Sequence, residues 1–281
     1  MDKQYNLNPA FNLSVIISIM ASIVSVSGLF IKNIYHDNAF VRSAWFTNDL
    51  ITLMVAVPFL ITALWFVKKG SIPGQLVWMG MLGYMGYNFA FYLFGTAFNI
   101  FFIGYVALFS LSIAALITGF DNLDINGIAR LFSPNTPVKW ISIYIMVIGV
   151  MLFMVEMGMI SNYLLTGMLP QTILLTGQQT SIVFAMDLSI VVPFSVITSI
   201  LLWKRRAWGY VFGMIMLLKG FTYGLVLSVG TALLAYSPAY SKWDPLMPFY
   251  VILVIGGFAG SWILLKNMKK ANNIKEVIIQ K

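Results

Sequence analysis

The sequence contains no cysteine, and among its 281 residues it has a single histidine, His36. Without cysteine the chain has no disulfides, no thiolate metal ligands and no thiol catalysis. With one histidine it cannot build a bis-histidine haem site or a multi-histidine metal centre. We therefore expect no metal and no cofactor.

Charge is also scarce. Only 9% of the residues are charged and 60% are hydrophobic, whereas soluble domains carry about 25% charged residues. A chain this poor in charge cannot cover its surface with polar groups, so its solvent is lipid. We predict an all-α polytopic integral membrane protein that forms a single membrane domain over residues 1–281. That length accommodates about eight transmembrane helices of about 20 residues each.

Familiar catalytic motifs are missing too. The sequence contains no GxSxG, no HExxH, no phosphate-binding loop and no dinucleotide fingerprint, so no catalytic residue is assigned. The formal net charge of +8 indicates basic cytoplasmic loops of a multi-pass protein rather than nucleic-acid binding.

Long apolar runs predict the spans. The first run is too long for the core of a signal peptide, and we interpret it as a retained helix. The uncharged stretch 161–180 contains Gly, Pro, Gln and Thr, which favours an interfacial or re-entrant segment. The predicted helices cover residues 11–31, 49–67, 72–94, 97–120, 140–160, two helices within 181–236, and 246–265.

Basic residues predict the orientation. Eight spans place both termini on one side, and that side would carry 13 lysines and arginines against three on the other, with Lys219 inside the membrane. The positive-inside rule then places both termini in the cytoplasm. We expect the protein to lie in the cell membrane, as a multi-pass protein of a bacterial cytoplasmic membrane.

The two halves of the chain match at an offset of 135 residues. Pro58-Phe59 corresponds to Pro193-Phe194, the segment 95–97 to 230–232, and Tyr84 to Lys219. The pattern favours two parallel four-helix repeats, with halves 11–120 and 140–265 related by an axis along the membrane normal. Chance matches between apolar sequences are the alternative.

Two charged residues stand inside predicted spans. Asp187 and Lys219 each cost about 2.5–3.5 kcal/mol in hydrocarbon, so such residues face a bundle interior and pair. Lys219 lies 11 residues beyond Trp208, roughly 16 Å into the membrane. We predict that these two residues bind a substrate or ion in the outer half of the bundle, together with Glu156, Asp49, Asn88 and Asn99.

Each of these residues has a structural alternative. Asp49 would serve only as a helix N-cap, Glu156 as an interfacial acid, and the two asparagines as helix-to-helix hydrogen-bonding groups. Asp187 and Lys219 would form a structural ion pair.

Two prolines lie near the centres of predicted spans. Pro58 and Pro193 leave the carbonyls of Met54 and Ser189 without their helical donors. We expect helix kinks there, either beside a substrate site or as ordinary irregularity of membrane helices.

These features favour a permease-like transporter of a small solute, an ion or protons. The first alternative is an accessory, assembly or sensory subunit, for which the glycine-rich helix faces and short loops provide a surface for a membrane protein partner or a homo-oligomer. The second alternative is a membrane-embedded enzyme that modifies lipids, which would need acids facing an open groove. In every case the bilayer is the main partner.

Overall fold

The computed structural model describes residues 7–236 and 244–269, and within them every regular element is a helix. In lipid a helix satisfies all its backbone hydrogen bonds internally, so the long apolar runs fold this way. The elements are α1 (Asn8–Phe30), α2 (Ala39–Ile51), η1 (Thr52–Ala56), α3 (Val57–Lys68), α4 (Ile72–Gly95), α5 (Phe102–Asn122), α6 (Ile125–Leu131), α7 (Val138–Thr166), α8 (Gln171–Thr176), α9 (Ile182–Met186), η2 (Asp187–Val191), α10 (Val192–Trp203), α11 (Ala207–Ala235) and α12 (Met247–Lys266).

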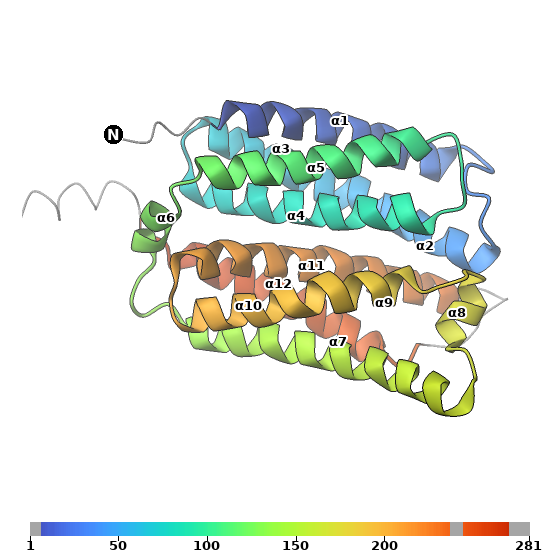
Figure 1. The fold of residues 1–281 in the computed structure, drawn as a ribbon. Helices are drawn as coiled ribbons and strands as arrows, with labels where there is room; N and C mark the ends of the chain where they lie inside the picture. The colour runs from blue at the N-terminus through green and yellow to red at the C-terminus, as the bar shows by residue number, and fades with distance from the viewer. Residues whose placement is uncertain (1–6, 237–243, 270–281) are drawn as a thin grey trace, which may run out of the picture.

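Within the described residues, seven helical spans are long and apolar enough to cross a membrane, and two of them, Ala39–Lys68 and Ile182–Trp203, each include a π turn. The 24-residue α4 is not among them, but it runs alongside them (Figure 1). Its tyrosines, glycines and Asn88 lower its hydropathy, and most of its residues are buried. The all-α polytopic fold is therefore confirmed, and the expected count of eight spans holds if the buried α4 is included.

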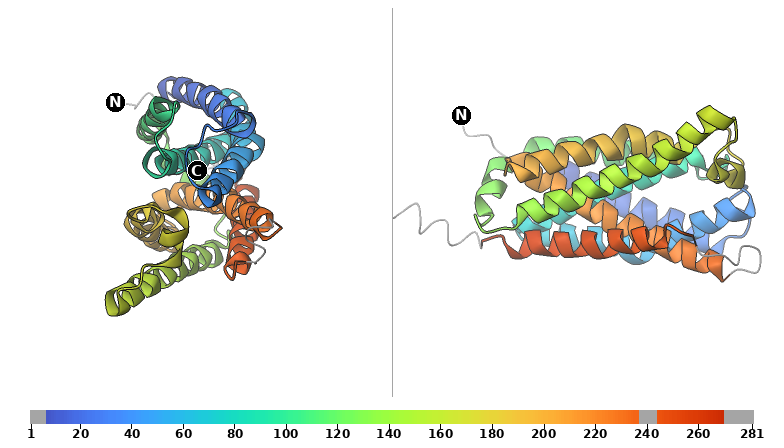
Figure 2. Two further views of the ribbon diagram at one scale, coloured as in Figure 1. Left: turned by 90° about the vertical axis from the view of Figure 1, so that its right-hand side faces the viewer. Right: turned by 90° about the horizontal axis from the view of Figure 1, so that it is seen from below.

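The helices lie in two groups. Figure 1 shows α1 to α5 on one side and α7 to α12 on the other, with α6 joining the groups at one end of the bundle. The end-on view in Figure 2 shows that α7 projects away from the rest of its group. Accordingly, α7 has the lowest buried share of the seven spans, 17%.

Two helices contain a π-helical turn at their centre. In η1 the N–H of Val57 donates to the carbonyl of Thr52, and in η2 the N–H of Val192 donates to the carbonyl of Asp187. Each turn directly precedes a helix that has proline as its second residue, Pro58 or Pro193. The expected irregularities are thus π turns, which accommodate the missing proline donor by widening the helix.

Three segments differ from the sequence-based expectation. The second span begins at Ala39 rather than at residue 49, because the polar residues before Asp49 belong to the helix. The fourth begins at Phe102 rather than 97. In the stretch 161–180, α7 continues to Thr166, and the short α8 follows between two left-handed glycines, Gly167 and Gly177.

The two groups meet along α4 and α11, with glycines at the contact. A Cβ on Gly83 would collide with Ile215, and a Cβ on Gly80 would collide with Leu218. At the offset of 135 residues, Gly80 corresponds to Ile215 and Gly83 to Leu218. Exchanging the two halves therefore turns one contact into the other. Reciprocal contacts of this kind are the pattern of a two-fold interface.

Basic residues gather at one end of the bundle, which we call the basic end. There α1 begins, α12 ends, and the N–H of Lys269 donates to the carbonyl of Leu131, the last residue of α6 (Figure 1). The opposite end has only Lys32 and Arg42 among the described lysines and arginines; residues 3, 242, 270, 275 and 281 lie outside the described part. The basic end carries Lys68, Lys69, Arg130, Lys139, Lys204, Arg205, Arg206, Lys266 and Lys269.

Candidate functional site

Three of the six predicted site residues meet in the second group of helices. Asp187 begins η2, Lys219 lies in the middle of α11, and Glu156 lies on the buried face of α7. The Lys219 ammonium lies 3.9 Å from Oδ1 of Asp187, and Glu156 interacts with both residues. We call these residues, together with Tyr87 and Tyr223, the charged cluster.

Two tyrosines complete the charged cluster. The hydroxyl of Tyr87 donates to Oδ1 of Asp187 at 2.5 Å. The Lys219 ammonium lies 3.8 Å from the centroid of the Tyr87 ring and 5.1 Å from that of Tyr223, at distances where an aromatic face attracts a cation. Because Tyr87 comes from α4, the first group of helices reaches across to hold the acid of the second.

The charged cluster is mostly buried within the bundle. The side chains of Lys219 and Asp187 are 12% and 6% exposed, and Glu156 is 3% exposed. Lys219 lies 12 residues into the 29-residue α11, about 18 Å from its start, so the cluster lies near the middle of the bundle. Pairing with Asp187 accounts for a lysine at this depth. The alternative interpretation of Asp187 and Lys219 as a structural ion pair requires the same contact.

Charge in the cluster does not balance. Two carboxyl groups face one ammonium, and Oε2 of Glu156 is buried without a hydrogen-bond partner among the described residues. A buried charge without a partner costs several kcal/mol, on the order of 3–5. The site is neutral only when it also holds one proton or one monovalent cation.

Small residues allow α7 to bring Glu156 into the cluster. Buried Ser142, Ile145, Gly149 and Glu156 lie on one face of α7 at helical spacing. A Cβ on Gly149 would collide with Ser195 of α10, so glycine permits the close approach. This contact fixes α7 against α10 two turns before Glu156.

Asp49 lies in a separate site in the first group of helices. It is fully buried, and it accepts hydrogen bonds from Tyr35 at 2.5 Å and Tyr92 at 2.9 Å. The N-cap of this helix is Asn38, which accepts from the N–H of Val41, so the interpretation of Asp49 as an N-cap is wrong. Burial, and next the Asp49 carboxylate, raise the pKa of the Tyr35 phenol in the loop before α2.

The asparagine side chains bond residues outside the charged cluster. Asn88 is fully buried in α4 and donates to Oγ1 of Thr52, which bonds the hydroxyl of Tyr84 at 3.1 Å. Asn99 lies in the turn before α5, where its side chain donates to the carbonyl of Ala97 and accepts from the N–H of Phe101. The hydrogen bonds and ion pairs of the six predicted residues thus fall into several groups.

The sequence reasoning missed the three tyrosines that donate to the acids, Tyr35, Tyr87 and Tyr92, and also Tyr223 beside Lys219. Tyr223 lies four residues after Lys219, one helical turn away, and this spacing was visible in the sequence. Tyr87 and Tyr92 belong to a run of tyrosines and glycines in α4, where spacing alone does not separate packing residues from hydrogen-bond donors. Tyr35 comes from a loop, and nothing in its local sequence connects it to Asp49.

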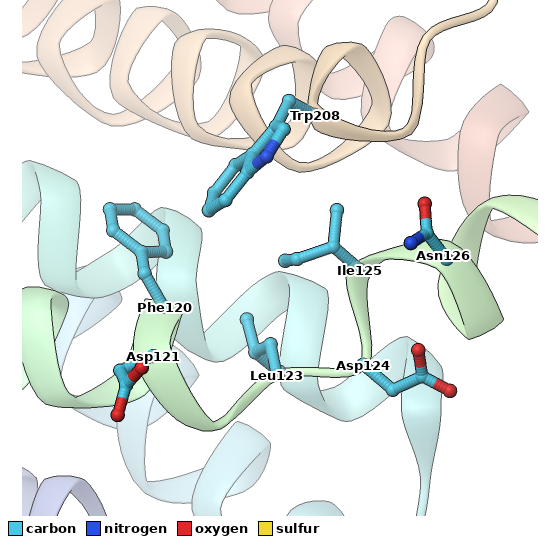
Figure 3. Close-up of a pocket in the computed structure, with 7 residues that line it drawn as sticks. All are labelled: Phe120, Asp121, Leu123, Asp124, Ile125, Asn126 and Trp208. Atoms are coloured by element: carbon cyan, nitrogen blue, oxygen red, sulfur yellow. The ribbon is translucent and has the colours of Figure 1, made fainter. Parts of the chain in front are cut away.

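A pocket of about 400 Å³ opens elsewhere, at the basic end of the bundle. It lies between the end of α5, α6 and the start of α11, and Figure 3 shows Trp208 facing Phe120 and Ile125 across it. The carboxylates of Asp121 and Asp124 point away from this space (Figure 3). Asp124 caps α6 and pairs with Arg130, so this pocket is not part of the charged cluster.

No protein-family model, curated protein or solved structure matches this chain.

Proposed function

We propose that the protein is a proton- or cation-linked transporter of a small solute, with the charged cluster as its coupling site. The observation that carries the proposal is the buried set of two carboxyls and one ammonium, Glu156, Asp187 and Lys219. Intramembrane ionisable residues mark proton and ion pathways. A buried set that is one charge short of neutrality is suited to binding and releasing a small cation.

Glu156 is the residue that binds the proton or cation in this proposal. Its Oε2 has no protein partner among the described residues, whereas Asp187 is bonded to Tyr87 and paired with Lys219. When Glu156 loses its proton, the extra negative charge draws the Lys219 ammonium away from Asp187 and from the ring of Tyr87 on α4. The charge change therefore reaches the boundary between the two groups of helices.

Movement across this boundary would expose the site alternately to the two sides of the membrane. Tyr87 lies on α4 and its acceptor on η2, so a relative shift of the two groups breaks or makes this bond. Transporters with internal repeats hold their ligands near the midplane, between the moving parts. The depth of Lys219 supports the same arrangement here.

Purified protein in proteoliposomes would test the proposal. An imposed membrane potential drives proton entry, an entrapped pH-sensitive dye reports it, and amino acids, sugars, organic acids and sodium chloride are added in turn. We expect one of these additions to cause acidification, and we expect Glu156→Gln to abolish it. Tyr163→Phe, which alters an exposed residue of the same helix, should leave the signal within about twofold of the unaltered chain. Full proton coupling in Glu156→Gln would refute the role of this residue.

A partner-binding subunit is the second candidate function, because α7 carries a largely exposed apolar surface. Recovery of the chain in a stable complex with a defined membrane protein, without any solute-dependent proton entry, would favour it. The lipid-modifying enzyme has less support, because the acids of the charged cluster are buried rather than exposed to lipid. The cytoplasmic location of both termini remains part of the proposal.

A further inference from the structure

An apolar groove of about 320 Å³ runs between α7 and α10 on the outside of the bundle. Its walls include Ile143 and Val147 from α7 and Ile200 from α10, which are 40%, 46% and 44% exposed. These residues belong to membrane-spanning helices, so the groove is open to the lipid. The full lining is Ser142, Ile143, Met146, Val147, Ser199, Ile200, Trp203 and Lys204.

The groove begins at the membrane boundary. Trp203 is the last residue of α10, and Val147 lies nine residues into α7, so the groove extends about 13 Å inward from the basic end. Tryptophans at such positions mark the level of the lipid headgroups. The groove therefore has its mouth at the headgroup level and its walls along the acyl-chain region.

Basic side chains surround the mouth. Lys204 lines the groove, and the ammonium of Lys139 lies 5.5 Å from the centroid of the Trp203 ring. Arg205 is already engaged, since its guanidinium donates to the carbonyl of Thr136 at 2.8 Å. Among the described residues, the acids at this end are Asp121 and Asp124, which lie at the separate pocket beside α6.

We propose that this groove binds an anionic phospholipid of the bilayer. One acyl chain lies between α7 and α10, and the phosphate lies between Lys139 and Lys204 at the mouth. Basic pockets between transmembrane helices on the cytoplasmic side are suited to anionic headgroups. The apolar walls can hold the acyl chain of any phospholipid. A preference for lipids with an anionic headgroup must therefore come from Lys139 and Lys204.

The bound lipid would also lie beside the contact between α7 and α10. Helix α7 is fixed to α10 at Gly149 and Ser195 and carries Glu156 two turns further on. The groove lies between the basic end and this contact. A lipid that occupies it holds α7 and α10 at a fixed separation there.

Native mass spectrometry of the full-length protein would test the proposal. The protein is released from detergent after addition of phosphatidylglycerol or phosphatidylcholine, and the retained lipid is counted. We expect tighter retention of phosphatidylglycerol, and a loss of about 25-fold in Lys139→Gln/Lys204→Gln, about fivefold for each lysine.

Two further variants keep the test decisive. Lys68→Gln/Lys69→Gln removes the same charge from the same end of the bundle but not from the groove, and it should retain the lipid as the unaltered chain does. Ile143→Trp fills the groove and leaves both lysines in place, and it should lower retention of both lipids. If the two double lysine variants lost phosphatidylglycerol equally, the lipid would be held by general attraction to the basic surface, and the proposal would be overturned. Equal retention of the two lipids, or full retention in Ile143→Trp, would also overturn it.

Discussion

At the scale of single residues, the buried acids are held in different ways. Asp187 is held by a tyrosine and a lysine, Asp49 by two tyrosines, and Glu156 has a carboxyl oxygen without a protein partner among the described residues. The sequence predicted that charges in apolar runs would pair, because an isolated charge in hydrocarbon is costly. It could not predict which tyrosines would hold them, because tyrosine is common in these helices and the pairing depends on how the helices are rotated.

Removing the amine should destabilise the protein more than removing the pair. Lys219→Met leaves Asp187 and Glu156 buried without a counter-charge, and we expect a loss of about 3–5 kcal/mol. Lys219→Met/Asp187→Asn removes the charge of both partners and should recover most of that loss. Unfolding of the purified protein in mixed micelles, followed by circular dichroism, measures the difference. A double variant that is no more stable than Lys219→Met would contradict the pairing.

Tyr35 should make stability depend on alkaline pH. Its raised pKa in the folded state means that its contribution is present below the usual tyrosine pKa of about 10. That contribution is lost as pH rises from there, because the unfolded chain releases the proton first. We therefore expect the loss of stability above about pH 10 to be smaller in Tyr35→Phe.

The matched control is Tyr163→Phe, which alters an exposed tyrosine of α7. This variant should follow the pH dependence of the unaltered chain. An identical alkaline loss in Tyr35→Phe and the unaltered chain would contradict the contribution of Tyr35.

At the scale of helices, the two π turns are the features that place the polar groups. Thr52 and Asp187 each begin one of them, and each contacts the residue of α4 or α11 that lies 32 positions later, Tyr84 or Lys219. The prolines indicated an irregularity at both positions. The sequence could not distinguish a kink from a π turn, because both accommodate a missing donor and the choice depends on packing against neighbouring helices.

Restoring the missing donor should rigidify the π turn. In Pro193→Ala the new N–H can enter the helical hydrogen-bond pattern, and we expect amide exchange across residues 187–193 to slow by about tenfold. That factor equals about 1.4 kcal/mol, part of the ~3 kcal/mol that proline costs inside a regular helix. Hydrogen–deuterium exchange with mass spectrometry measures it.

Two other prolines serve as comparisons. Pro58→Ala should slow exchange around η1 in the same way. Pro248 is the second residue of α12, where a helical N–H has no intrahelical acceptor, so Pro248→Ala should leave exchange there unchanged. Unaltered exchange in both Pro58→Ala and Pro193→Ala would contradict the assigned role of the prolines.

At the scale of the whole molecule, we propose that the two groups of helices are repeats. The π turns lie 135 residues apart, and so do the left-handed residues Gly70 and Arg205 after α3 and α10. The contacts between α4 and α11 are reciprocal at the same offset. The divergence of α7 breaks this regularity, and apolar periodicity could not predict it, because every face of a lipid-exposed helix is apolar.

The reciprocal contacts between α4 and α11 predict that a larger residue at either glycine is tolerated only when its own partner on α11 is made smaller. Gly83→Val should collide with Ile215 and cost about 1–3 kcal/mol, and adding Ile215→Ala should restore most of the loss. Gly80→Val should be rescued by Leu218→Ala in the same way, whereas the crossed combination Gly83→Val/Leu218→Ala should not recover. Thermal unfolding in detergent compares the six proteins, and rescue by the crossed pair would contradict the packing described here.

Because the sequence contains no cysteine, a single introduced cysteine can report which side of the membrane each end of the bundle faces. Single variants Lys32→Cys and Asn135→Cys place thiols at opposite ends of the bundle. If the basic end is cytoplasmic, a membrane-impermeant maleimide should label Lys32→Cys in intact cells and Asn135→Cys only after lysis. The reverse labelling would overturn the orientation inferred from the positive-inside rule.

The reciprocal contact of α4 with α11 has a consequence for how such a site can arise. Two identical half-length subunits could meet through the same two-fold contact, but every residue would then occur twice. Such a homodimer cannot place one unpaired lysine away from its axis. Joining the halves in one chain through the segment that contains α6 removes this restriction, so position 219 holds an amine while position 84 holds a phenol. If the halves are repeats, the connection between them is therefore what permits a single, asymmetric charge at the centre of the protein.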